Sequence, residues 1–299
     1  MKRLFTVLVA ASALLMVLAP APAHAQVDDA LSVLDPVNID GYLKPLQLAL
    51  GQAMGTGTFH GALIPVSGFN ASLDIITMQV WFQDKDRTYT ASTPEGFDPP
   101  TQAEASTIVG DGSATVVTGD GGAEYVFPGG FNMDNFFMAV PQLGLVFIPG
   151  TELLVRYITI STGDTELGSV DYLALGARHN VSQYFTNLPV DVSAGAWYHK
   201  FDIDSDLMTT KAWQIGAQVS KTFSMATVFG GLGYESYSAS VEYDSDTGPE
   251  TETVKVDMDG ESSIRLTGGV NLALSVVHVY GTLDYAKRLS ASLALGFGF

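Results

Sequence analysis

Apolar and polar residues alternate with a period of two along most of the chain after residue 72. The last segment shows this most clearly: Ala291, Leu293, Leu295, Phe297 and Phe299 are apolar, and only Ser, Ala and Gly lie between them. Because successive side chains of a β-strand point to opposite faces, this segment predicts a strand with one apolar face and one face of small residues. A strand that contacts lipid on one side and a crowded lumen on the other has this pattern.

Ten segments of this kind are predicted, separated by turn residues. They cover residues 73–82, 139–148, 151–159, 168–179, 190–203, 212–223, 226–243, 264–274, 276–286 and 291–299. Long and short linkers alternate between them, as in outer-membrane barrels, which in bacteria have an even number of strands. The predicted fold class is therefore all-β: an antiparallel transmembrane β-barrel of about 10 strands, or of 12 if a further hairpin lies within residues 58–66 or 115–127. In segment 190–203 the alternation shifts at Trp197, which predicts a β-bulge there.

Residues 26–58 lack the strict alternation. Apolar residues three and four positions apart predict a short helix over Ile39–Met54, with Pro45 in its first turn. Two interpretations stay open, a helix in the periplasm or a plug that enters the barrel, and the first is preferred. The predicted organisation is a signal peptide over 1–25, a periplasmic N-terminal segment with a short helix over 26–58, and an outer-membrane β-barrel over 59–299.

The first 25 residues have the composition of a secretory signal. Lys2 and Arg3 precede an apolar run over residues 4–18, and Ala23-His24-Ala25 matches a signal peptidase site. Cleavage after Ala25 would leave Gln26 as the first residue of the mature chain. Export and the barrel pattern together predict a location in the outer membrane of a Gram-negative cell.

The composition narrows the expected partners. The chain contains no cysteine and carries a formal net charge of −18. Disulfides therefore play no part, and nucleic acid is not expected, because phosphate binding needs clustered Lys and Arg. We expect outer-membrane lipid, lipopolysaccharide and the barrel assembly machinery instead. The apolar positions that end the last strand resemble the signal read by that machinery, and they are Leu293, Leu295, Phe297 and Phe299.

Several motifs resemble one known family. They are Phe127-Pro128-Gly129-Gly130-Phe131, Ala139-Val140-Pro141-Gln142-Leu143-Gly144-Leu145, Gly150-Thr151-Glu152-Leu153-Leu154-Val155-Arg156-Tyr157, Gly176-Ala177-Arg178-His179-Asn180 and Leu188-Pro189. The sequence is similar in these motifs to an uncharacterised family of bacterial outer-membrane proteins, over roughly Phe59 to Phe299. The resemblance implies an outer-membrane barrel, and it implies no activity, ligand or catalytic residue.

The alternation also places charged side chains in the predicted lumen. Those residues are Glu152, Arg156, Arg178, Asp191, Arg265 and Asp284. Charges at membrane depth are costly unless they are paired or hydrated, so the choice is between structural ion pairs, which we prefer, and a selective water path. The histidines His60, His179, His199 and His278 lack metal-ligand spacing, and the chain has no Gly-x-Ser-x-Gly nucleophile motif. We expect no cofactor and no enzymatic activity.

Two acidic runs, Asp202–Asp206 and Asp257–Glu261, resemble calcium loops in composition but do not fit an EF-hand pattern. They are interpreted as solvated outer loops, with divalent cations as candidate partners. Ten to twelve strands enclose a narrow lumen, which predicts a narrow pore or a barrel for binding or transport of small molecules. The alternative function is a structural or surface-interaction barrel that acts through its acidic outer loops.

Overall fold

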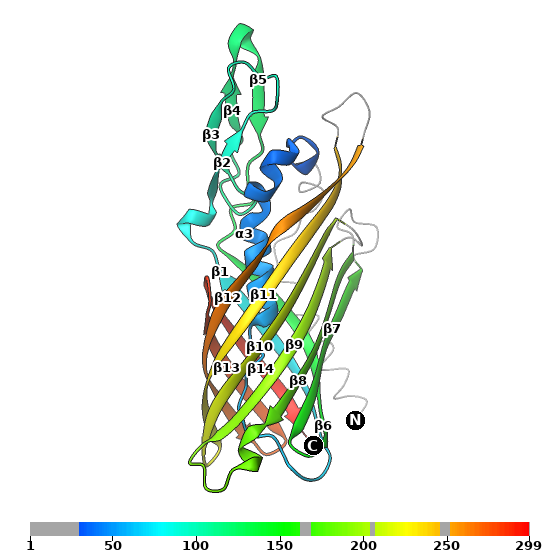
Figure 1. The fold of residues 1–299 in the computed structure, drawn as a ribbon, viewed down its shortest axis with the longest axis vertical. Helices are drawn as coiled ribbons and strands as arrows, with labels where there is room; N and C mark the ends of the chain where they lie inside the picture. Colours follow the sequence, from blue (N-terminus) through cyan, green and yellow to red (C-terminus); the bar gives the residue numbers. More distant parts are fainter. Residues whose placement is uncertain (1–29, 162–168, 204–206, 246–251, 299) are drawn as a thin grey trace.

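A closed antiparallel β-barrel of ten strands forms most of the molecule (Figure 1). The structure is a computed structural model that describes residues 30–161, 169–203, 207–245 and 252–298. The barrel strands are β1 (Asn70–Trp81), β6 (Asn135–Ile148), β7 (Thr151–Ser161), β8 (Ser169–Asn180), β9 (Asp191–Ile203), β10 (Met208–Phe223), β11 (Ala226–Ser245), β12 (Glu252–Leu274), β13 (Val277–Tyr285) and β14 (Leu289–Gly298). Strands β6 to β14 pair in chain order, and β1 closes the ring between β14 and β6. The ten predicted strands are confirmed. The predicted signal peptide, its cleavage site and Phe299 lie outside the described residues.

The two ends of the barrel differ. At one end the strands are joined by short turns such as Pro149-Gly150 and Ser224-Met225, with the four-residue 3₁₀ helix η3 (Val181–Tyr184) in the β8–β9 connection. We call this the turn end, and the opposite one, which carries the remaining elements of the chain, the loop end (Figure 1). Among the described residues no helix is both long and apolar enough to cross a membrane.

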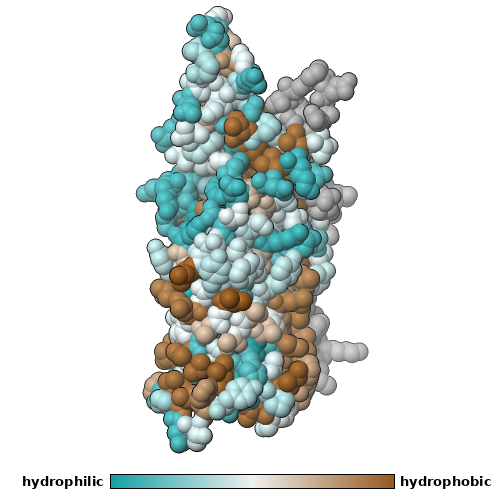
Figure 2. Space-filling view, viewed as in Figure 1, coloured by the Kyte–Doolittle hydropathy of each residue, from teal (hydrophilic) through white to brown (hydrophobic). Residues whose placement is uncertain are grey.

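The predicted faces of the strands are confirmed. On β14, Leu293 and Leu295 point outward, with 58% and 48% of their surface exposed, whereas Ser292 and Ala294 are buried inside. On β10, Trp213, Ile215 and Val219 point outward, whereas Gln214 and Gln218 between them are buried inside. Figure 2 shows the result as apolar side chains gathered over the turn-end half of the barrel, with polar ones towards the loop end.

The predicted bulge at Trp197 is wrong. Strand β9 pairs with β8 and with β10 without a register shift. Trp197, His199 and Phe201 instead continue the inward positions of the strand and are buried. The alternation only seemed to shift because large aromatic side chains occupy inward positions, where small or polar ones were expected.

The N-terminal helix is longer than predicted. Helix α3 spans Pro36–Gly55 and is capped by Asp35, whose Oδ1 accepts a hydrogen bond from the Val37 amide at 3.0 Å. It begins at a proline because the first helical position needs no amide hydrogen. Pro45 consequently lies inside the helix and not in its first turn, which corrects that expectation.

Helix α3 runs down the inside of the barrel and is followed by an extended stretch that continues to the turn end. There the Gly150 amide donates to the Pro65 carbonyl at 2.9 Å. Leu50, Ala53 and Met54 of the helix are buried inside the barrel. We call residues 36–65 the plug. The segment therefore has the arrangement of the plug interpretation and not that of the preferred one, a helix in the periplasm.

The long connection between β1 and β6 forms a cap at the loop end (Figure 1). This cap, residues 83–134, holds two small antiparallel sheets, and the hairpin at 115–127 is one of them, so the 12-strand alternative is wrong. Its elements are η1 (Asp84–Asp86), β2 (Thr88–Ser92), β3 (Gln102–Ser106), β4 (Thr115–Thr118), η2 (Asp120–Gly122) and β5 (Glu124–Phe127). The cap holds the outer part of α3: the Tyr42 hydroxyl donates to the Gly129 carbonyl at 2.9 Å, and Asn38 donates to the Ser92 carbonyl at 2.9 Å.

Candidate functional site

Three buried arginines of the barrel wall bind the backbone of the plug. Arg265 on β12 donates to the Gln52 carbonyl at 2.9 Å, and Arg156 on β7 donates to the Thr56 and Gly57 carbonyls at 3.1 and 2.7 Å. These carbonyls lie at the C-terminal end of α3, where the last turn of a helix has free acceptors and a partial negative charge. The wall arginines therefore satisfy the end of the plug helix with hydrogen bonds and with charge.

The third arginine acts nearer the turn end. Arg178 on β8 donates to the Gly61 carbonyl at 2.9 Å and to the Glu152 carboxylate. His60 of the plug lies against the same pair, with Nε2 at 2.7 Å from Arg178, and its ring stacks on Tyr280 at 4.9 Å. Charge and ring contacts together fix this part of the plug.

The counter-charges are distributed unequally. Arg265 pairs with Glu235 at 2.6 Å and lies 3.6 Å from Asp284. Arg156, which is fully buried, pairs with no carboxylate among the described residues. Its remaining contacts include the Gln142 side chain at 2.9 Å, the Met78 sulfur at 3.5 Å and the ring of Trp197, whose centroid lies 4.8 Å from the guanidinium carbon.

Small residues of the wall make room for the plug. Phe59 is buried against Gly216 and Gly231, where an added Cβ would come within 2.5 and 2.6 Å of the ring. Further hydrogen bonds follow the plug to the turn end: Thr58 to Gln214, the Gly61 amide to Gln218, the Ala62 amide to Ser220, and Asn180 to the Ile64 carbonyl.

The structure brings five of the six predicted lumen residues into this network. Glu152, Arg156, Arg178, Arg265 and Asp284 lie inside the barrel, and the arginines contact the plug. Asp191 lies at the turn end of β9, is partly exposed and takes part in no ion pair with another described residue. Glu152, Arg178, Arg265 and Asp284 form the ion pairs of the preferred explanation, whereas Arg156 is held by neutral acceptors.

Sequence reasoning missed other members of the network. Glu235 alternates with the outward Tyr234, so the period-two pattern on β11 could have found it. Asp74 on β1, which pairs with His278, could have been found in the same way. His60 and Gln52 belong to the plug, and no periodicity indicated that they face the wall.

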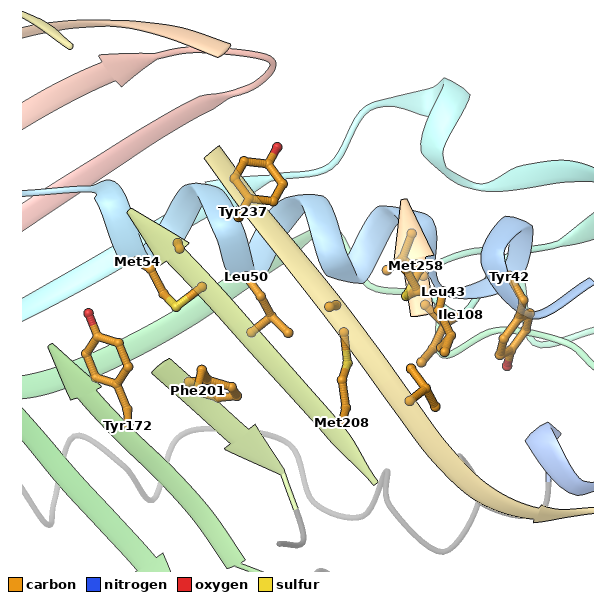
Figure 3. Packing of buried hydrophobic residues seen from close by; sticks show 14 of the residues in the cluster. Tyr42, Leu43, Leu50, Met54, Ile108, Tyr172, Phe201, Met208, Tyr237 and Met258 are labelled. Carbon is orange, nitrogen blue, oxygen red and sulfur yellow. The ribbon is translucent and has the colours of Figure 1, made fainter. Parts of the chain in front are cut away.

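The upper lumen has an apolar side and a polar side. Leu50 and Met54 of α3 point towards strands that carry Tyr172 and Phe201, as Figure 3 shows. The buried apolar wall residues of this side are Ile76, Met78, Val80, Val140, Tyr172, Trp197 and Phe201. The buried polar wall residues of the opposite side are Glu235, Arg265, Thr282, Asp284, Ser290 and Ser292. The plug helix therefore packs against apolar side chains of β1, β6, β8 and β9 and is hydrogen-bonded by Arg265 of β12, while Arg156 of β7 binds the carbonyls that follow the helix.

A cavity of about 440 Å³ lies beside the last residues of the plug at the turn end. Its polar lining includes His60, Asp74, Glu152, Arg178, Asn271 and His278. The Nδ1 atom of His60 and the Oδ1 atom of Asn271 are buried there without a hydrogen-bond partner within the described chain. The barrel is thus filled from the loop end down to a polar vestibule.

The acidic run Asp257–Glu261 is not a solvated loop, because it lies within β12. Glu261 pairs there with Lys44 of the plug at 3.0 Å and with Lys287. Residues 204–206 of the other run lie outside the described residues. Within the described ranges, no group of three or more His, Asp or Glu residues has an arrangement that could hold a metal ion, and cation binding stays a prediction.

The family model described as a family of unknown function (DUF6588) matches residues 1–299. One similar solved structure is a loop-deletion mutant of OmpT, an outer membrane protein of Vibrio cholerae, which is 11% identical; the match covers 78% of this chain and 98% of that chain, with a TM-score of 0.28. Another is Ail of Yersinia pestis, which is 11% identical; the match covers 78% of this chain and 100% of that chain, with a TM-score of 0.27. The toluene transporter TbuX of Ralstonia pickettii is also similar, with 9% identity, coverage of 82% of this chain and 92% of that chain, and a TM-score of 0.26. No curated protein matches the chain.

Proposed function

The chain belongs to the family of unknown function DUF6588, and we propose that this member is an outer-membrane barrel that passes a small molecule only when its N-terminal plug moves. The membrane part of the proposal is supported by the apolar band over the barrel (Figure 2). Outward aromatic residues, among them Tyr157, Tyr198, Trp213 and Tyr234, lie on the loop-end side of that band. Barrels of the outer membrane carry such aromatic girdles, with short turns in the periplasm and longer loops outside. Lipid, lipopolysaccharide and the assembly machinery are the corresponding proposed partners.

The observation that carries the gating part is the fit between plug and wall. A barrel of about eight strands can fill its interior with its own side chains. In this barrel, glycine occupies two of the inward positions, Gly216 and Gly231, and Phe59 of the plug fills the space beside them. Residues 36–65 thus occupy the space that the ten-strand wall encloses, which in the proposed function is the passage. Hydrogen bonds, ion pairs and packing hold the plug in place, and such contacts are reversible.

A cysteine lock tests whether the plug must move. The Thr56 and Ser290 hydroxyls lie 2.9 Å apart, one on the plug and one on β14. In T56C/S290C, oxidation would join plug and wall, and no native cysteine competes because the chain has none. The matched control is T282C/S292C, which joins two wall strands whose hydroxyls lie 2.7 Å apart.

The readout is single-channel conductance in planar bilayers, together with solute uptake into proteoliposomes. We expect brief openings that oxidation abolishes in T56C/S290C, that reduction restores, and that the control pair leaves unchanged. Openings that persist in the oxidised lock would show that the plug does not gate the barrel. A complete absence of openings and of uptake in the unmodified chain would count equally against the proposal.

The surface-interaction alternative depends on acidic loops. Parts of them, residues 204–206 and 246–251, lie outside the described residues, and no contact in the described chain favours that function.

A further inference from the structure

The hydrogen-bonded ladder between β6 and β7 ends halfway along the two strands. Pairing runs from Ile148 with Thr151 up to Gln142 with Arg156, and it extends no further among the described residues. Above that point, residues 135–141 of β6 still pair with β1, and residues 157–161 of β7 still pair with β8. In the described chain, no backbone pairing therefore joins these two strands towards the loop end. Pro141, the first residue beyond the last pair, has no amide hydrogen to donate to a ladder. We call this unpaired stretch of the wall the split.

The split begins within the outward apolar band. Leu143 and Tyr157, which flank the last pair, expose 41% and 57% of their surface on the outer face. In the proposed membrane orientation, the split therefore begins at the outer edge of the hydrocarbon of the outer leaflet, at the level of the aromatic girdle to which Tyr157 belongs. Lipid cannot hydrogen-bond unpaired backbone groups, so an unpaired stretch at this depth is costly and needs an explanation.

Flexible apolar side chains lie behind the split. Met138 and Ile158, inward neighbours on its two edges, pack against the buried cluster that contains Met54 and Met78. Methionine is unbranched and polarisable, and it repacks readily around different partners. The interior at this level can therefore accept an apolar guest when α3 shifts.

The floor of the split is a charge without a counter-ion. Arg156 closes the ladder, is fully buried, and pairs with no carboxylate in the described chain. Asp74 is linked to it only through Gln142, and Asp74 itself pairs with His278. A buried guanidinium that lacks a counter-charge is costly.

Unpartnered polar atoms lie beside that charge. Trp197, whose ring lies against Arg156, has no acceptor for its Nε1 hydrogen within the described chain, and the Nε2 atom of His199 is likewise unpartnered. Both side chains are at most 3% exposed. Buried polar groups usually have partners, so these two atoms retain hydrogen-bonding capacity that a ligand group could use.

We propose that the split admits a small amphipathic carboxylate from the outer leaflet, with its carboxylate on Arg156 and the Trp197 indole and its apolar body among the methionines. This inference rests on the proposed function and names its substrate class. A carboxylate is a stronger acceptor for a guanidinium than a neutral carbonyl is. It would therefore compete with the Thr56 and Gly57 carbonyls for Arg156, and binding would loosen the plug.

The test uses Trp197 as its own reporter. The chain has three tryptophans, and W81F/W213F leaves only the one beside Arg156. The protein in lipid nanodiscs is titrated with dodecanoate, dodecanol and dodecyltrimethylammonium, which share an apolar body and differ in head group. We expect dodecanoate to change Trp197 fluorescence saturably and to bind at least about tenfold more tightly than the other two. Equal affinities, or tighter binding of the cation, would overturn the carboxylate site.

Two matched variants test the route. Ile158→Gln places a polar group on the inner edge of the split, whereas Tyr157→Gln changes the adjacent outward residue of the same strand. We expect the first to slow dodecanoate association about tenfold, the rate equivalent of about 1.4 kcal/mol, and the second to leave it unchanged. Equal rates in both variants would place the entrance elsewhere. Quenching of Trp197 by brominated lipid chains without any dodecanoate response would assign the split to bilayer lipid and overturn the proposal. The titration requires no passage through the barrel, so it can succeed or fail independently of the conductance test.

Discussion

Gly231 offers a sharp test of how the plug is seated. A Cβ at this inward position would lie 2.6 Å from Cδ2 and 3.1 Å from Cε2 of the buried Phe59 ring, and 3.3 Å from the Ala217 carbonyl. Overpacking of this kind costs about 1–3 kcal/mol, so Gly231→Ala should destabilise the seated plug by that amount. The adjacent Gly230 points outward, and a Cβ there would meet only the Thr267 carbonyl at 3.6 Å. Gly230→Ala should therefore change stability by less than about 0.5 kcal/mol.

Hydrogen exchange measures the effect directly. The amides of Gly61 and Ala62 donate to Gln218 and Ser220 only while the plug is seated. Since about 1.4 kcal/mol is a factor of ten, their exchange should accelerate roughly 5- to 150-fold in Gly231→Ala and hardly at all in Gly230→Ala.

The Phe59→Ala background completes the test. Phe59→Ala alone should cost about 3–5 kcal/mol, and in that background Gly231→Ala should become milder, with a coupling of about 0.5–3 kcal/mol. Equal exchange rates in the two glycine variants, or no coupling to Phe59, would refute the seating described here.

Three further results are expected. Leu293 lies at an outward mid-strand position, so Leu293→Arg should lower the free energy of unfolding in the membrane by about 2–4 kcal/mol. Urea unfolding followed by heat-modifiable gel migration measures this change. An unchanged unfolding transition would show that Leu293 does not face lipid. Arg265→Met leaves Glu235 buried without its ion-pair partner and should lower the free energy of unfolding by about 3–5 kcal/mol. Adding Glu235→Gln should recover part of this loss. Strictly additive effects of the two substitutions would contradict the pairing. Burial raises the pKa of Tyr42 from 10.0 to about 12, so the stability that the protonated hydroxyl contributes is complete below pH 10 and is lost as the pH rises towards 12. Tyr42→Phe should therefore reduce the loss of stability at alkaline pH. If Tyr42 gave tyrosinate absorbance already near pH 10, its hydroxyl would not be buried.

The barrel wall could be predicted from the sequence because each strand obeys a local rule. Leu293 and Ser292 must face opposite sides whatever the rest of the chain does, and the same rule placed Arg156, Arg178 and Arg265 inside. The rule constrains only which face a residue occupies. It says nothing about what fills the interior.

The plug could not be predicted in this way because its contacts are irregular and distant in sequence. Gln52 meets Arg265, 213 positions away, and Phe59 fits glycines whose role is visible only when both partners are placed. The bulge at Trp197 was predicted wrongly for the same reason. An inward aromatic side chain is expected there only once an apolar face of the plug helix is known to lie opposite it.

In the proposed orientation, the plug adds one more passage of the chain between the two sides of the membrane. Leu31 lies with Leu43 and Met208 at the loop end, and Pro65 lies at the turn end. Residues 30–65 therefore run from the cell surface inwards, surrounded by the ten strands that the same chain forms later. An epitope inserted near Asp35 would be accessible to antibodies on intact cells, whereas one at Gly298 would be reached only from the periplasm. The ring of strands closes where β1 joins β14, so in the proposed orientation the finished barrel encloses a segment whose outer end, near Leu31, lies on the cell-surface side.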